Sequence, residues 1–139
     1  MIIDATNLIL GRFCTVAAKK ALIGEEIHIV NCSKAVISGK KQIVLNKYKR
    51  IMRMGVPSKG PHLHRSSYRL VKRCIRGMLP YKQPRGRDAL KRIKCYNNIP
   101  KVLKDKKIET IKNANVNKLP NFNFVKVGEI SKLIGGKNE

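Results

Sequence analysis

The sequence predicts a single α/β domain with a mostly parallel sheet, and three observations support this fold class. A short apolar segment at residues 1–4 precedes apolar residues at helical spacing over 10–22, and a β-branched segment over 26–32 follows. A strand, a helix and a strand joined by short links form a βαβ unit, so the two strands should be parallel. The length of 139 residues and the hydrophobic content of 42% are those of one ordinary globular domain.

The first helix should end at Gly24, because glycine readily adopts the left-handed conformation of a helix C-cap. Residues 33–39 should form a turn-like connection. Residues 40–54 should form a second helix, with apolar residues on one side and Lys and Arg on the other. Residues 55–65 contain two Pro, two Gly and no apolar periodicity, which predicts a loop. A loop of this length in a compact domain is usually functional.

A third helix should begin at Ser66 or Ser67, either of which can cap it, and should stop at Pro80. Its apolar stripe comprises Leu70, Val71, Cys74, Ile75 and Met78. A basic turn is expected over residues 81–87, followed by a short helix over 88–93.

Residues 93–96 should add another strand, and the two asparagines at 97–98 suit a tight turn, since asparagine tolerates positive φ. We divide the chain into an α/β domain at residues 1–100 and a C-terminal extension at 101–139 that packs on or beside it. Within the extension, the expected elements are a connector over 113–123, a strand over 122–127 and a helix over 127–134 capped by Gly135.

The charge is strongly positive and unevenly placed. The formal net charge is +23, and the sequence pI is about 10.4. Residues 47–94 hold sixteen Lys or Arg but a single acidic residue, Asp88. A merely solvated surface mixes charges of both signs, whereas a concentration of one sign indicates a polyanionic partner. We therefore predict a nucleic-acid-binding face. A membrane span is not expected, because no stretch approaches 18 uninterrupted apolar residues.

The cysteines and the N-terminus point to a reducing compartment. The four cysteines lie at positions 14, 32, 74 and 95 with no CxxC pair, which argues against a zinc site. The apolar N-terminus carries Asp4 and lacks a basic region, so it does not read as a secretory signal. We therefore expect four reduced and mostly buried cysteines, without a disulfide framework.

His62 and His64 lie one residue apart in the basic loop. A metal site would need a third ligand, and none is near in the sequence. An acid–base pair for RNA cleavage is the enzymatic alternative, but contact with RNA is the favoured interpretation. The glycine patterns of dinucleotide-binding and P-loop proteins are absent despite the βαβ unit.

Three stretches resemble a known family. They span residues 2–40, 59–100 and 125–135. The second stretch is the most specific, because it contains GP-H-R, RGMLP and RG-AL-R-K-Y in this order and spacing. The chain resembles the universal large-subunit ribosomal protein thirteen, the L-thirteen family, in its archaeal and eukaryotic branch.

The resemblance implies an α/β domain with a four-stranded parallel sheet flanked by helices. It implies a structural role in the large ribosomal subunit, bound to large-subunit rRNA and to neighbouring ribosomal proteins. It also implies a protein that is not an enzyme, with no cofactor, no membrane and no small-molecule substrate. The location would be cytoplasmic, with nucleolar assembly in a eukaryote. Charge placement and motif position together predict these rRNA contacts: Arg53, Lys59, His62, Arg65, Arg69, Arg73, Arg76, Lys82, Arg85, Arg87, Lys91 and Lys94.

Two alternatives use the same basic face. One is a free RNA-binding regulator that acts outside the ribosome. The other is a cationic protein at a membrane surface, although no predicted helix pairs a wide apolar face with aromatic residues that could contact lipid.

Overall fold

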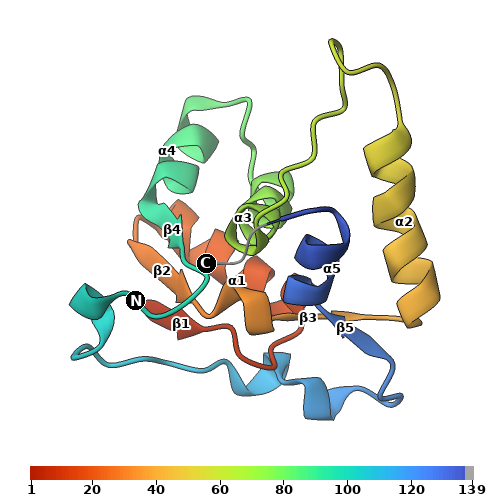
Figure 1. Cartoon of the computed structure of the whole chain (residues 1–139). Coiled ribbons are helices and arrows are strands. Elements are labelled where there is room, and N and C mark those ends of the chain that lie inside the picture. The colour runs from red at the N-terminus through yellow and green to blue at the C-terminus, as the bar shows by residue number, and fades with distance from the viewer. Residues whose placement is uncertain (137–139) are drawn as a thin grey trace.

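A three-stranded parallel sheet forms the centre of the fold. The computed structural model describes residues 1–136. Strands β1 (Ile2–Asp4), β2 (Ile27–Val30) and β4 (Ile93–Cys95) pair in the order β1-β2-β4, all parallel (Figure 1). The predicted α/β class is confirmed, but the expected four-stranded sheet has three strands.

Helix α1 (Leu10–Ile23) makes the predicted crossover between β1 and β2. Phe13, Ala17 and Ala21 on its inner side are completely buried. The helix ends as expected at Gly24, where φ is 115° and the backbone N–H donates to the carbonyl of Ala21 at 3.2 Å. The βαβ unit therefore follows directly from the apolar spacing and the terminal glycine.

Helix α3 (Ser67–Met78) packs against α1 and the sheet through Leu70, Val71 and Ile75, all of which are buried. Ser66 occupies the predicted N-cap position, but its side chain makes no capping hydrogen bond. The predicted core stripe is confirmed at Leu70, Val71 and Ile75, whereas Cys74 is half-buried and Met78, in the last turn, is exposed. The packed stripe holds the basic residues of the helix on its outer side.

Helix α4 spans Pro84–Arg92, so the prediction of a basic turn through residue 87 and a helix from residue 88 was wrong. Proline is well suited to the first helical position, because its missing N–H has no intrahelical partner there. Gly86 fixes the first turn of the helix against the α3–α4 connection. An added Cβ at Gly86 would collide with the carbonyl oxygen of Pro80.

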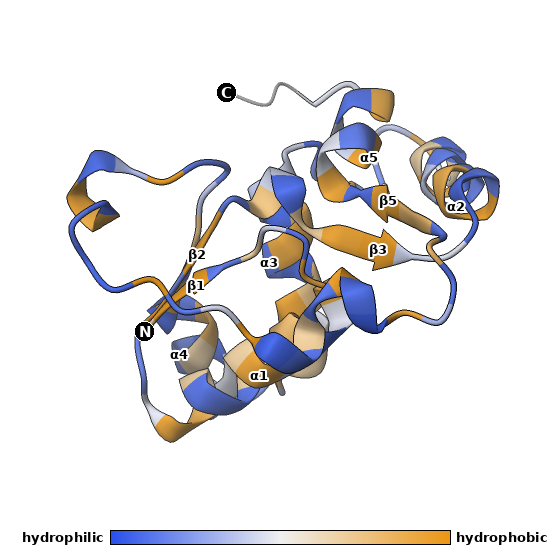
Figure 2. Cartoon of the chain, turned by 90° about the horizontal axis from the view of Figure 1, so that it is seen from below, coloured by the Kyte–Doolittle hydropathy of each residue, from blue (hydrophilic) through white to orange (hydrophobic). Residues whose placement is uncertain are grey.

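A second, antiparallel pair of strands replaces the predicted turn over 33–39. A 3₁₀ helix at Cys32–Lys34 leads into β3 (Val36–Ser38), which pairs with β5 (Phe124–Lys126). Helix α5 (Val127–Leu133) follows β5 directly, as expected, with Gly135 at a φ of 78°. In Figure 2, β3 and β5 are largely hydrophobic and lie beside α5 and α2 (Lys41–Arg53).

The free edge of β1 shows why the sheet stops at three strands. Glu109 makes a single parallel bridge to Ile3: its N–H donates to Ile2 at 2.9 Å, and its carbonyl accepts from Asp4 at 3.0 Å. Ile108 and Ile111, on either side of it, pack into two different hydrophobic clusters. The chain therefore crosses this edge instead of running along it.

The remainder of the segment after Pro100 consists mainly of 3₁₀ helices at Lys101–Leu103, Lys112–Ala114 and Val116–Lys118. Asn97 and Asn98 form a bend without positive φ, so the turn argument for them was wrong; positive φ occurs instead at Asn7 and Asn31. Side chains from the segment, including Ala114, belong to the main core. We propose on this basis that it is an extension of the α/β domain, of which residues 137–139 lie outside the described part.

Gly86→Ala should destabilise the protein by about 1–3 kcal/mol, because the new methyl group would force the α3–α4 connection apart. Gly77→Ala is the matched control, since a Cβ at this α3 position would meet no atom within 4 Å. The control should gain about 0.5–1 kcal/mol from helix propensity. Urea unfolding measures both changes, and a Gly86→Ala protein as stable as wild type would contradict the packing described.

Asp4 should make stability dependent on pH. Burial raises the pKa of Asp4, but hydrogen bonds from Asn31 and Thr6 outweigh it and hold the pKa below its usual range. Its contribution is therefore complete above the unfolded pKa of about 3.9 and is lost as the pH falls through the lower folded value. Asp4→Asn should cost about 1–2 kcal/mol at pH 7 and almost nothing near pH 2, as measured by urea unfolding across this range. A cost that does not change with pH would refute this role.

Candidate nucleic-acid interface

The basic face, residues 47–94, begins on helix α2. Val44 is the buried residue of this helix, whereas Lys47, Lys49 and Arg50 are exposed. The helix stands at one edge of the molecule, with its inner side against α5 and β5 (Figure 1). Its apolar side is thus occupied by the core, and its cations point outward.

The segment between α2 and α3 projects beyond the body of the protein as a finger (residues 54–66; Figure 1). An antiparallel bridge joins Val56 to Gly60. Gly55 and Gly60 have φ values of 72° and 84°, and a Cβ on Gly55 would collide with the carbonyl oxygen of Gly60. The predicted loop therefore contains an ordered turn, and the close approach of the backbone at Gly55 to the Gly60 carbonyl requires glycine.

The base of the finger is attached to two helices. The Ser131 hydroxyl of α5 donates to the carbonyl of Arg65 at 2.6 Å. The Arg73 guanidinium of α3 donates to the carbonyl of His62 at 2.9 Å. These bonds fix the basic side chains of the finger relative to those of α3.

Helix α3 presents a row of cations on its outer side. Arg69, Arg73 and Arg76 recur at intervals of four and three residues, which places them on one stripe. Nε of Arg69 donates to the Tyr68 hydroxyl at 3.0 Å, and the Arg76 guanidinium lies 5.1 Å from the centre of the Tyr81 ring. These contacts restrain the side chains but do not neutralise them.

The twelve predicted contact residues have few acidic partners. Eleven are exposed and Arg73 is half-buried. In the described part of the chain, Lys91 is the one member that lies within 4.0 Å of a carboxylate, at 3.4 Å from Asp88. An exposed pair of this kind is worth little. The face therefore remains cationic in the folded protein.

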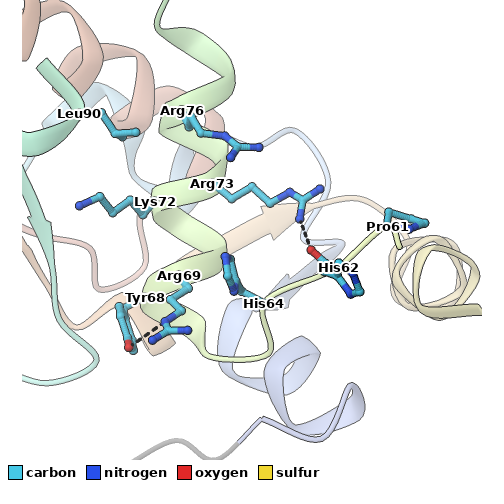
Figure 3. Close-up of a pocket in the computed structure, with 9 residues that line it drawn as sticks. All are labelled: Pro61, His62, His64, Tyr68, Arg69, Lys72, Arg73, Arg76 and Leu90. Carbon is cyan, nitrogen blue, oxygen red and sulfur yellow. Dashed lines mark hydrogen bonds between the residues drawn. The ribbon is translucent and has the colours of Figure 1, made fainter. Parts of the chain in front are cut away.

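The structure brings some of the twelve together and separates others. His62, Arg69, Arg73 and Arg76 line one cavity of about 710 Å³ (Figure 3). The other members, apart from Lys94, fall into three further places. Arg53 and Arg65 line a cavity of about 470 Å³ on the finger, Lys59 lies at its tip, and Lys82, Arg85, Arg87 and Lys91 lie along the α3–α4 connection and α4.

Lys94 lies away from the others. It pairs in register with His28, and side chains alternate along β4, so it faces the side of the sheet opposite the buried Ile93. Burial and the nearby charge of Lys94 both lower the pKa of His28. The sheet therefore separates Lys94 from the α3 row.

Five further residues of the large cavity were absent from the predicted set: Pro61, His64, Tyr68, Lys72 and Leu90. Lys72 could have been found, because it neighbours Arg69 and Arg76 on the helix surface. Tyr68 gives no signal in the sequence, since its position depends on how α3 meets the strand end, where its N–H donates to the side chain of Asn97 at 3.1 Å.

Residues 1–136 contain no group of three His, Cys, Asp or Glu side chains placed to hold a metal ion. None of the helices in this range is long and apolar enough to span a membrane. Cys14 and Cys32 are buried, and Cys74 and Cys95 are half-buried.

A compact α/β domain whose cations are concentrated in residues 47–94 defines the class, and comparison with known proteins identifies the family. The family model described as ribosomal protein L13 matches residues 1–102. "Large ribosomal subunit protein uL13" of Methanosarcina barkeri is 44% identical over 98% of both chains. The Picrophilus torridus protein of the same name is 44% identical over 96% of this chain and 95% of its own. The chain therefore belongs to the ribosomal protein L13 family, as the resemblance predicted.

Membership of the L13 family argues against the enzymatic alternative, in which His62 and His64 would cleave RNA as an acid–base pair. The relatives are ribosomal structural proteins, in a family not known for enzymatic activity. The prediction that the protein is not an enzyme is confirmed on this ground.

Arg73→Ala should loosen the finger with little effect on global stability. The variant loses the hydrogen bond to the His62 carbonyl, which is worth about 1 kcal/mol at an exposed site. Hydrogen exchange at residues 57–62 should accelerate. Arg69→Ala is the control, because the partner of Arg69 is the adjacent Tyr68 and not the finger. Equal exchange rates in both variants would show that Arg73 does not anchor the finger.

Proposed function

We propose that the protein is a structural constituent of the large ribosomal subunit that binds and stabilises folded large-subunit rRNA through the basic face. It takes part in translation as part of the ribosome. The observation that carries the proposal is the near absence of acidic partners for the cations of residues 47–94 in the described structure. The names of the archaeal relatives, which assign them to the large subunit, support the choice of partner.

The proposed rRNA contacts are those predicted from the sequence, in four places. The finger supplies Lys59, His62 and Arg65, and the adjoining end of α2 supplies Arg53. Helix α3 supplies Arg69, Arg73 and Arg76. The α3–α4 connection and α4 supply Lys82, Arg85, Arg87 and Lys91, and β4 supplies Lys94.

Most of these contacts would be to phosphates. The guanidinium of Arg matches phosphate oxygens in a bidentate geometry, and Lys acts as a mobile point charge. Side chains do not reach base edges in the deep, narrow major groove of A-form RNA, so recognition depends on shape and on the backbone. Binding of several RNA elements at once would raise the overall affinity and oppose dissociation by salt.

Neighbouring large-subunit proteins are the proposed protein partners, and the cytoplasmic ribosome is the proposed location. The relatives named above are archaeal.

Arg76→Glu should reduce incorporation into the large subunit by at least about tenfold, because the variant replaces a phosphate-binding cation with a repelling anion. The fold should remain intact, since Arg76 is exposed and such changes cost no more than about 0.5 kcal/mol. Tagged protein in purified subunits measures the effect. Lys19→Glu is the matched control, because it makes the same charge change at an exposed α1 position outside the basic face. Normal incorporation of Arg76→Glu would show that this side of α3 does not face RNA.

A further inference from the structure

The larger cavity of the basic face has properties that contact with phosphates alone does not require. It lies between α3 and the finger, and it has a volume of about 710 Å³, within the range of small-molecule sites (Figure 3). Its lining residues are Pro61, His62, His64, Tyr68, Arg69, Lys72, Arg73, Arg76 and Leu90. A phosphate on a duplex surface is contacted from outside and needs no hollow of this size.

One wall of the cavity is an anion-binding wall. Arg69, Arg73 and Arg76 stand along one stripe of α3, and no carboxylate of residues 1–136 lines the cavity or pairs with them. Each guanidinium already has a protein contact: the Tyr68 hydroxyl, the His62 carbonyl and the Tyr81 ring, respectively. The contacts leave further N–H groups available while limiting side-chain freedom. Less entropy is consequently lost when an anion binds.

The cavity also has ring surfaces beside these cations. His64 comes from the finger and Tyr68 from the start of α3, where Arg69 lies next to them, whereas Leu90 of α4 lies at the other end of the helix beside Arg76 (Figure 3). Aromatic rings such as those of His64 and Tyr68, together with guanidinium planes, are the surfaces on which unpaired RNA bases stack. The cavity thus combines a surface for a base with a row of donors for phosphate.

We propose that this cavity receives one unpaired nucleotide of the bound RNA, with its base against His64 and Tyr68 and its phosphate on Arg73 and Arg76. The inference rests on the proposed function and adds one point of single-stranded contact to the phosphate contacts. A base pair within a duplex is too large and too deeply stacked to enter, so the nucleotide must come from a bulge, loop or junction. The finger closes one side of the cavity and would hold the nucleotide in place.

The test compares two hexanucleotide RNAs that carry the same number of phosphates, one with bases and one abasic. Full-length protein should bind the base-bearing RNA about five- to a hundredfold more tightly at fixed salt, the range expected for one stacked base. His64→Ala should remove most of this preference. Arg50→Ala, an exposed α2 variant outside the cavity, should weaken both RNAs equally and leave the ratio unchanged.

The outcomes separate this inference from the proposed function. Equal affinity of wild-type protein for the two RNAs would overturn the nucleotide site while leaving phosphate binding in place. Failure to bind either RNA would count against both proposals. Binding of free adenosine 5′-monophosphate as tight as that of the hexanucleotide would also overturn the inference, because the cavity would then be a small-molecule site.

Discussion

The packing of α3 against α1 and the central sheet is the contact on which the rest of the structure depends. Leu70, Val71 and Ile75 bury one side of this helix completely or almost so, and the other side can present only its cations. The same helix anchors the finger through Arg73 and leads into α4 through the close approach at Gly86. Loss of the α3 packing would therefore disrupt the core and, at the same time, separate the cations of the basic face.

The free energy gained by this packing opposes an electrostatic cost. The folded protein holds like charges close together along α2, the finger, α3 and α4, and few acidic side chains of the described chain offset them. Such a surface is repulsive in isolation and is stabilised when a polyanion binds. The fold and the proposed function are coupled in this way: the core forces the charges together, and the RNA neutralises them.

Some features could be predicted from the sequence and others could not, for physical reasons. The helical spacing of Phe13, Ala17 and Ala21 and the terminal Gly24 specify α1 locally. The family motifs specify the archaeal and eukaryotic branch of the L13 family. The strand predicted over 122–127 corresponds to β5, but β3 and its pairing with β5 were missed, because β3 has three residues and lies far from β5 in the chain. The start of α4 was missed because it depends on Gly86 meeting Pro80 in space. The candidate cations were chosen from charge placement and motif position, whereas the cavity formed with Pro61, Tyr68 and Leu90 exists only once the finger and α3 meet.

The most direct test of the account is sedimentation of tagged protein from cell lysate through sucrose gradients, at low salt and at about 0.5 M salt. A single patch of phosphate contacts would lose most of its affinity over such a range, whereas simultaneous binding to several rRNA elements would survive it. We expect the tagged protein to co-migrate with the large subunit at both salt concentrations. Protein that stays at the top of the gradient, or that high salt strips from the subunit, would contradict an integral ribosomal role and favour a free RNA-binding regulator.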